Sequence, residues 1–223
     1  SPNDVYLEGR ALLRTGRLAE ARLLLQQQAA EERLSESLRP QRFHRETVML
    51  LSLVCSMLGL SDEAEKYSRE GIEISRQLQS DFVEAVGFMR LGHALQINSA
   101  SPWDQPRRQE ALLDYQRSIE QVHPFKVARV GVEPLWGLCR IFGYNGDVIS
   151  AGQKARSALE ISEMAGDEWI GDLVRVSMGA SLAMAGNPAE ARAWLERAAE
   201  GFSRVGDDSS WCCATLWLAL NAW

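Results

Sequence analysis

The sequence predicts an all-α protein made of repeated pairs of antiparallel helices, about five and a half pairs with a period of about 40 residues. Apolar residues between the turns recur at helical spacing, as in Leu112, Tyr115 and Ile119, and the alternation typical of strands is absent. A helix-opening alanine also recurs, at spacings of 43, 47, 40 and 40 residues, in Ala21, Ala64, Ala111, Ala151 and Ala191. Such periodicity is typical of arrays in which each helix pair packs on its neighbours.

Each predicted pair contains a tight turn five residues before the repeated alanine. Four of the five turns have a glycine at that place, and the third has Pro106; the glycines are Gly16, Gly59, Gly146 and Gly186. Glycine ends helices because it adopts the left-handed conformation without steric cost. Asn187 and Pro188 then form a suitable N-cap and first-turn pair for a following helix. The unit is therefore predicted to be helix, tight turn, helix.

Small residues are expected where the two helices of a pair approach each other. They occur twelve residues before the repeated alanine in four units, and in the third once a seven-residue insertion is allowed for: Gly9, Ser52, Gly92, Cys139 and Gly179. The segment 98–106 contains this insertion and two prolines. Such a loop could be functional, although extra turn residues are usually neutral.

We expect a single repeat domain over residues 1–223. Its units are predicted at 2–40, 41–80, 81–123, 124–165 and 166–206, with a half unit at 207–223. Asp81, Asp167 and Asp207 are each expected to open the first helix of a unit. The chain begins with Ser1 and enters a helix almost at once, which suggests a piece of a longer protein.

The units follow a pattern of a glycine or another small residue, an alanine twelve residues later, and then a large and a small residue. This pattern resembles the tetratricopeptide repeat (TPR). The large position is Leu25, Tyr115 and Leu195 in three units, whereas Ser68 and Ala155 depart from it. The resemblance covers nearly the whole chain and implies a right-handed superhelical α-solenoid. It also implies that the first helices of the pairs line a concave binding surface.

The period of about 40 exceeds the usual 34 residues. Long units of this kind resemble those of MalT-like, LuxR-family ATP-dependent transcriptional regulators of bacteria. In that family a P-loop ATPase precedes the repeats and a helix-turn-helix domain follows them. The resemblance implies a region that senses an effector or partner protein. The alternative is a free-standing TPR adaptor that binds a peptide or assembles a complex.

The family's inward-facing positions give a candidate concave groove. Three of its arginines could hold a carboxylate or phosphate through paired hydrogen bonds. Its aromatic and methionine residues suit adaptable recognition, but each is also a reasonable core residue. The candidate residues are Tyr6, Arg10, Arg14, Glu46, Met49, Met89, His93, Gln96, Glu133, Trp136 and Arg140.

The C-terminal segment 207–223 is apolar on nearly every side of a helix, and such a helix is expected to be buried. We therefore expect either that the natural protein continues beyond this helix or that two chains associate through it. The interface residues would be Trp211, Leu216, Trp217, Leu220 and Trp223.

Composition limits the partners. The net charge of −6 disfavours direct contact with nucleic acid and with anionic membrane surfaces. No signal peptide or membrane-spanning segment is visible. The four cysteines, Cys55, Cys139, Cys212 and Cys213, show no metal-binding or disulfide spacing, so we expect a reducing, cytoplasmic location and cysteines that pack in the core. A protein, a peptide or a small-molecule effector remains as the partner.

The sequence contains no recognisable catalytic or cofactor motif. Residues 146–154 lack the spacing of a nucleotide-binding P-loop. Glu120 and His123 form one E-x-x-H pair, but a di-iron site needs a second copy and two more glutamates. We therefore expect no metal, no cofactor and no enzymatic activity, and a function in binding.

Overall fold

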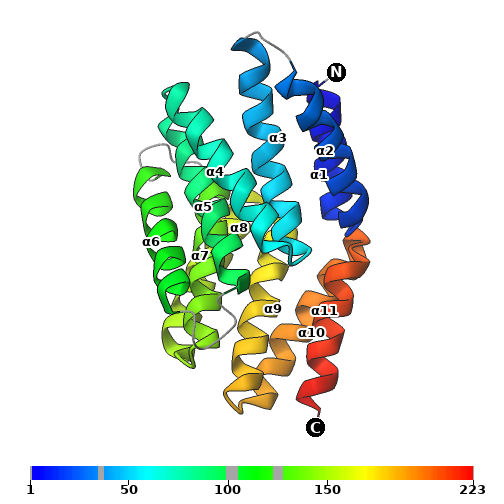
Figure 1. Cartoon of the computed structure of the whole chain (residues 1–223). Helices are drawn as coiled ribbons and strands as arrows, with labels where there is room; N and C mark the ends of the chain where they lie inside the picture. Colours follow the sequence, from blue (N-terminus) through cyan, green and yellow to red (C-terminus); the bar gives the residue numbers. More distant parts are fainter. Residues whose placement is uncertain (1, 35–37, 99–104, 123–127, 223) are drawn as a thin grey trace. The chain divides into compact units, whose positions relative to one another are not determined.

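The computed structural model of the chain describes residues 2–34, 38–98, 105–122 and 128–222. Regular structure in these ranges is entirely α-helical, which confirms the predicted fold class (Figure 1). The helices are α1 (Pro2–Arg14), α2 (Leu18–Arg33), α3 (Leu38–Met57), α4 (Ser61–Gln77), α5 (Asp81–Asn98), α6 (Gln105–Val122), α7 (Ala128–Tyr144), α8 (Val148–Ala165), α9 (Glu168–Met184), α10 (Pro188–Val205) and α11 (Asp208–Asn221).

The helices form two compact units, Ser1–Phe125 with α1–α6 and Lys126–Trp223 with α7–α11. Within each unit every helix packs on the next one in sequence. The odd-numbered helices, called first helices here, also contact one another: α1 with α3, α3 with α5, α7 with α9, and α9 with α11. The even-numbered helices are called second helices. This is the pattern of a helical solenoid, whereas one continuous repeat domain over both units remains a prediction.

The turns between first and second helices have the predicted conformation. Gly146 and Gly186 have φ angles of 85° and 78°, which only glycine adopts without strain. Asp147 caps α8, because its carboxylate accepts a hydrogen bond of 3.0 Å from the Ser150 backbone N–H. Asn187 occupies the N-cap position of α10 as predicted, but its side chain makes no capping hydrogen bond.

Small residues lie where the paired helices approach each other, as predicted, but Gly9 and Gly179 meet large side chains of the second helices and not the repeated alanines alone. A Cβ atom added at Gly9 would lie 3.0 Å from Leu25 Cδ2, and one at Gly179 would lie 2.6 Å from Leu195 Cγ. The distance at Gly179 is too short for the present packing, so a methyl group there would displace Leu195, whereas at Gly9 the Leu25 side chain would have to move by a few tenths of an ångström. The five repeated alanines are fully buried, which confirms that they are interhelix contact positions.

Ion pairs join successive second helices in the first unit. Each pair links an arginine of one helix to a glutamate of the neighbouring second helix, at N–O distances of 2.7 to 3.2 Å. Such partly exposed pairs contribute about 0.2–1 kcal/mol each, so they align the helices more than they stabilise them. The pairs are Arg22–Glu63, Arg33–Glu70, Arg69–Glu110 and Arg107–Glu65.

A buried histidine joins three helices of the first unit, and the sequence did not reveal it. His44 Nδ1 lies 3.0 Å from Glu32 Oε2, and His44 Nε2 lies 2.9 Å from Glu70 Oε1. Burial alone would lower the pKa of His44, but its hydrogen bonds to the two glutamates and their charges outweigh burial and raise the pKa to about 9. Thr47 Oγ1 and Gln28 Nε2 donate to Glu32 Oε1, so this internal carboxylate is fully hydrogen-bonded.

Within this chain, the last helix, α11, is buried on one face only, and its coverage by a further segment or a second chain stays a prediction. Ser210 and Ala214 face the interior, whereas Trp211, Leu216 and Leu220 are 42%, 60% and 57% exposed. The helices α9 and α10 pack only on the Ser210–Ala214 side of α11. Trp217 is half-buried, and Trp223 lies outside the described residues.

Two of the four cysteines also differ from the expectation. Cys55 and Cys139 are buried as predicted, but Cys212 and Cys213 are exposed, because they lie toward the uncovered side of α11. Among the described residues, no helix combines the length and apolar character needed to cross a bilayer. Residues 99–104 of the predicted insertion lie outside the described ranges.

Candidate functional site

In the second unit, the first helices α7, α9 and α11 form one layer, and α7 contributes a cluster of aromatic rings around an arginine. Trp136, Arg140 and Tyr144 are spaced four residues apart and therefore lie on one face of α7. We call these three residues the aromatic–arginine site. The sequence predicted Trp136 and Arg140 as groove residues but not Tyr144, which the same four-residue spacing could have indicated.

The tryptophan of this site is held rigidly by the neighbouring first helix. Trp136 is 8% exposed, and its Nε1–H donates a 2.8 Å hydrogen bond to Ser177 Oγ on α9. The Ser177 hydroxyl in turn donates to the Leu173 carbonyl oxygen at 3.1 Å. A ring fixed in this way offers a pre-formed surface, because little side-chain entropy is lost when a ligand contacts it.

Arg140 lies over both aromatic rings, with its Cζ atom 5.5 Å from the Trp136 ring centre and 5.8 Å from the Tyr144 ring centre. These are cation–π distances. In the described part of the chain, no carboxylate lies within ion-pairing distance of Arg140. Tyr144 is 46% exposed, so solvent reaches this end of the site. Among the described residues, the half-buried guanidinium of Arg140 therefore has two aromatic rings as neighbours and no ion-paired carboxylate.

The helix α11 also approaches Arg140. The Cys213 side chain is exposed, but neighbouring protein atoms still partly desolvate its thiol and raise the thiol pKa, and the positive charge of Arg140 partly opposes this effect. The carboxylate of Glu133, another predicted groove residue on α7, is buried in the interior of the unit. The accessible chemistry of this face therefore comes from Arg140 and Tyr144, with Trp136 as support.

Four predicted groove residues of the first unit lie at its surface or partly so. Arg10 is positioned over the Tyr6 ring, with 5.9 Å between its Cζ atom and the ring centre. Arg14 is half-buried on the same helix, α1. Glu46 is exposed and lies 3.7 Å from Arg45 Nη2. The structure brings Tyr6 and Arg10 together but gives them no common site with Glu46.

The other predicted residues of the first unit lie in its interior. Met49 packs against Gly71 and Gly87, and Met89 is 1% exposed. His93 is also 1% exposed, with its Nδ1 atom 2.7 Å from the Tyr115 hydroxyl. That hydroxyl lies 3.3 Å from Gln96 Oε1, so Gln96 belongs to the same internal network. His93 and Gln96 hold α5 on α6 through Tyr115, whereas Met49 packs α3 against α4 and α5. All four predicted side chains are buried.

Within the described ranges, no group of three or more histidine, cysteine, aspartate or glutamate side chains has an arrangement that could hold a metal ion. The buried thiols are also poor nucleophiles, because burial raises the pKa of Cys55 and of Cys139 to about 12. The aromatic–arginine site can bind an anionic or aromatic group, and it contains no acid–base pair for catalysis.

Comparison with known proteins identifies the fold. No protein-family model and no curated protein sequence matches the chain. A solved structure of a Rap protein in complex with competence and sporulation factor is similar over 98% of this chain, with a TM-score of 0.61 and 12% identity. The chain spans 62% of that Rap protein's length.

A second similar structure comes from a kinesin light chain of Podosopora anserina with nearly identical TPR-like repeats. It matches 91% of this chain and 94% of its own length, with a TM-score of 0.56 and 16% identity. Both neighbours are TPR-like repeat proteins, so the chain has a TPR-like α-helical repeat fold.

Proposed function

We propose that this chain is a non-catalytic scaffold that binds a protein or peptide partner through the aromatic–arginine site. The observation that carries the proposal is the unpaired charge of Arg140, which lies between two aromatic rings at a solvent-accessible face. A guanidinium in this state gains most from a carboxylate, which it can bind through two parallel hydrogen bonds. A carboxylate group on a small-molecule effector would satisfy the same site.

The fold supports this proposal. Repeat arrays expose extended surfaces built from successive helices, and binding is the usual use of such surfaces. The Rap structure contains a bound factor, which shows that a protein with this fold can hold a signalling ligand. For the present chain, binding of a peptide remains our inference from the local chemistry of α7.

We further propose that the chain is the effector- or partner-sensing region of a cytoplasmic bacterial transcriptional regulator. The long repeat unit supports this proposal through its resemblance to MalT-like, LuxR-family proteins. The alternative is a free-standing adaptor. Reading the gene on both sides distinguishes them, because a P-loop ATPase upstream and a helix-turn-helix domain downstream belong only to the regulator.

The binding proposal is tested with a panel of short peptides that end in either a free carboxylate or an amide, screened by thermal shift and followed by calorimetry. We expect some of the carboxylate peptides to bind. We expect Arg140→Ala to weaken their binding about tenfold or more, because the variant loses at least one of the two charge-assisted hydrogen bonds. Arg192→Ala is the matched control, because Arg192 is exposed on α10 and forms no ion pair with the residues that the structure describes. Equal affinities for the parent and Arg140→Ala would contradict the proposal.

A further inference from the structure

The first helices α7, α9 and α11 of the second unit carry corresponding residues at an interval of 40 in the sequence. The same interval separates Ala151 from Ala191, and it separates Asp167 from Asp207, which hold the N-cap positions of α9 and α11. Because α9 packs on both α7 and α11, residues that correspond in this way lie on the same face of the layer. We call this surface the α7–α11 face. The corresponding sets are Trp136, Val176 and Leu216; Arg140, Ala180 and Leu220; and Tyr144 and Met184.

The α11 edge of this face is apolar and exposed. Leu216 and Leu220 are each more than half exposed, and Met184 of α9 is 52% exposed. Between the two edges, α9 contributes the partly exposed Val176 and the buried Ala180, which are smaller than the corresponding residues of either neighbouring helix. The face therefore has larger side chains along α7 and along α11, with smaller ones at these two positions of α9.

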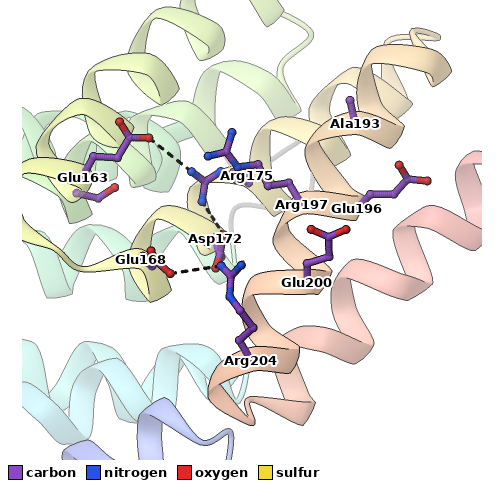
Figure 2. Close-up of a pocket in the computed structure, with 10 residues that line it drawn as sticks. Glu163, Glu168, Asp172, Arg175, Ala193, Glu196, Arg197, Glu200 and Arg204 are labelled. Carbon is purple, nitrogen blue, oxygen red and sulfur yellow. Dashed lines mark hydrogen bonds and ion pairs between the residues drawn. The ribbon is translucent and has the colours of Figure 1, made fainter.

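Within the ranges whose side chains the structure describes, the charge of the α7–α11 face comes from Arg140. The charged residues of α9 lie on the side of α8 and α10, in the ion pairs Glu168–Arg204 and Asp172–Arg175 (Figure 2). Helix α11 has one charged residue, Asp208, in its first turn. On α7, Glu133 is buried. Uncharged side chains thus separate the cation at the α7 edge from the leucines at the α11 edge.

The two edges are far enough apart to contact different residues of one ligand. Packed helices have axes about 8–10 Å apart, so α7 and α11, which both pack on α9, are separated by about 16–20 Å. An extended chain advances about 3.3 Å for each residue, so about five or six residues cover this distance. A single amino acid is too short to contact Arg140 and the two leucines together.

We infer that the α7–α11 face binds an extended peptide segment in which a carboxylate and a large apolar side chain are about five or six residues apart. The carboxylate pairs with Arg140, so the inference rests on the proposed function. The apolar side chain packs on Leu216 and Leu220, a contact that the proposed function does not require. Covering these leucines removes apolar surface from water, which favours an apolar group at this edge.

A second copy of α11 would also cover the two leucines. It has no acidic side chain after Asp208, however, so it would leave Arg140 without an anion. A peptide that carries both groups satisfies the cation and the apolar edge together, and for that reason we assign the face to a peptide.

The test uses the whole chain, isotopically labelled for NMR, and three peptides with an acetylated N-terminus and a free C-terminal carboxylate. The probe is Leu-Ser-Ser-Ser-Ser-Gly. In one comparison peptide serine replaces the leucine, and in the other the leucine stands directly before the C-terminal glycine. Titration of the tryptophan indole N–H signals gives the dissociation constants, including the weak ones expected of such short ligands.

The variant of the face is Leu216→Ser with Leu220→Ser. Its matched control is Ile149→Ser with Met164→Ser, which removes two apolar side chains of α8 that are 74% and 85% exposed. Circular dichroism confirms that both variants are folded, and analytical ultracentrifugation of the parent and the leucine variant measures self-association.

We expect the probe to bind the parent chain about tenfold more tightly than either comparison peptide, because only the probe can reach Arg140 and the leucines at once. The leucine variant should bind the probe about tenfold more weakly and should bind the serine peptide as the parent does. Arg140→Ala should weaken the binding of both peptides. The α8 control should bind all three peptides as the parent does.

The outcomes separate this inference from the proposed function. Equal affinities of the probe and of either comparison peptide, or an unchanged probe affinity in the leucine variant, would overturn the inference and leave the proposed function intact. Absent binding of all three peptides, or binding that Arg140→Ala does not weaken, would overturn both. Equal weakening in the α8 control, or a dimer that the leucine variant breaks, would also overturn the inference.

Discussion

The buried His44 gives a prediction that isolates one charge in the first unit. The perturbation is His44→Gln, which keeps a polar side chain but removes the positive charge between Glu32 and Glu70. In the folded chain the pKa of His44 is about 9, and its ordinary value is 6.5. Because the folded value is the higher one, the stabilisation is complete below pH 6.5 and is lost as the pH rises through 9.

The magnitude follows from this pair of pKa values. At 1.36 kcal/mol for each unit of difference, the protonated histidine stabilises the folded state by about 3 kcal/mol at low pH, and about 2.5 kcal/mol remain at pH 7. By pH 10 almost nothing remains. Burial would raise the pKa of Glu70, but hydrogen bonds to His44 and Arg33 hold this pKa near 2. Glu70 therefore titrates only in strong acid and does not change the stability between pH 6 and pH 10.

The assay is guanidinium unfolding of the parent and the variant from pH 6 to pH 10, followed by circular dichroism. Hydrogen–deuterium exchange of α2–α4 peptides reports on the first unit alone. We expect the free-energy difference between parent and variant to be about 2.5 kcal/mol at pH 7 and to shrink progressively toward pH 10. A difference that is the same at pH 7 and pH 10 would refute the assignment of a charged His44.

Two further predictions concern packing and burial. Gly179→Ala should lower the free energy of unfolding by about 1–3 kcal/mol, because the new methyl group would meet Leu195. The new methyl group of Gly152→Ala would make only ordinary contacts, so this variant should be neutral or stabilising. Comparing the thermal midpoints of the two variants tests both predictions. Burial raises the pKa of Asp114 to about 6, so the folded state disfavours the charged form of this side chain. The folded state therefore loses stability as the pH rises above 4. Asp114→Asn should therefore stabilise the chain by about 1–3 kcal/mol at pH 8 and have little effect at pH 3, and an equal effect at both pH values would disprove this reasoning.

The sequence predicted the helices well because the repeat is set by local rules. Turn glycines such as Gly146 and Gly186 and buried anchors such as Ala191 can be identified from spacing alone, since each acts on neighbouring residues of the chain. Gly179 and Leu195 stand at a small and a large position of the same repeat, although the sequence did not predict that they contact each other. These features predicted the turns and the antiparallel pairing of successive helices.

The candidate site was predicted only in part, because exposure depends on contacts that spacing does not define. Trp136 and Arg140 lie together as expected, but Met89 and His93 occupy equivalent repeat positions and are buried. Long-range charge contacts were also missed. His44 lies within hydrogen-bonding distance of carboxylates that are twelve and twenty-six residues away in the sequence. Helical periodicity does not predict contacts at these sequence separations.

The carboxylate of Asp207 has a consequence for the exposed side of α11. It is completely buried, accepts a 2.8 Å hydrogen bond from the Trp169 indole N–H, and caps the first turn of α11 through the Ser210 N–H. Asp207 thus ties the start of α11 to α9. The exposed apolar side chains of Trp211, Leu216 and Leu220 therefore stand on a helix whose direction is already fixed. A molecule that covers them would find a rigid template and would lose little entropy in ordering it.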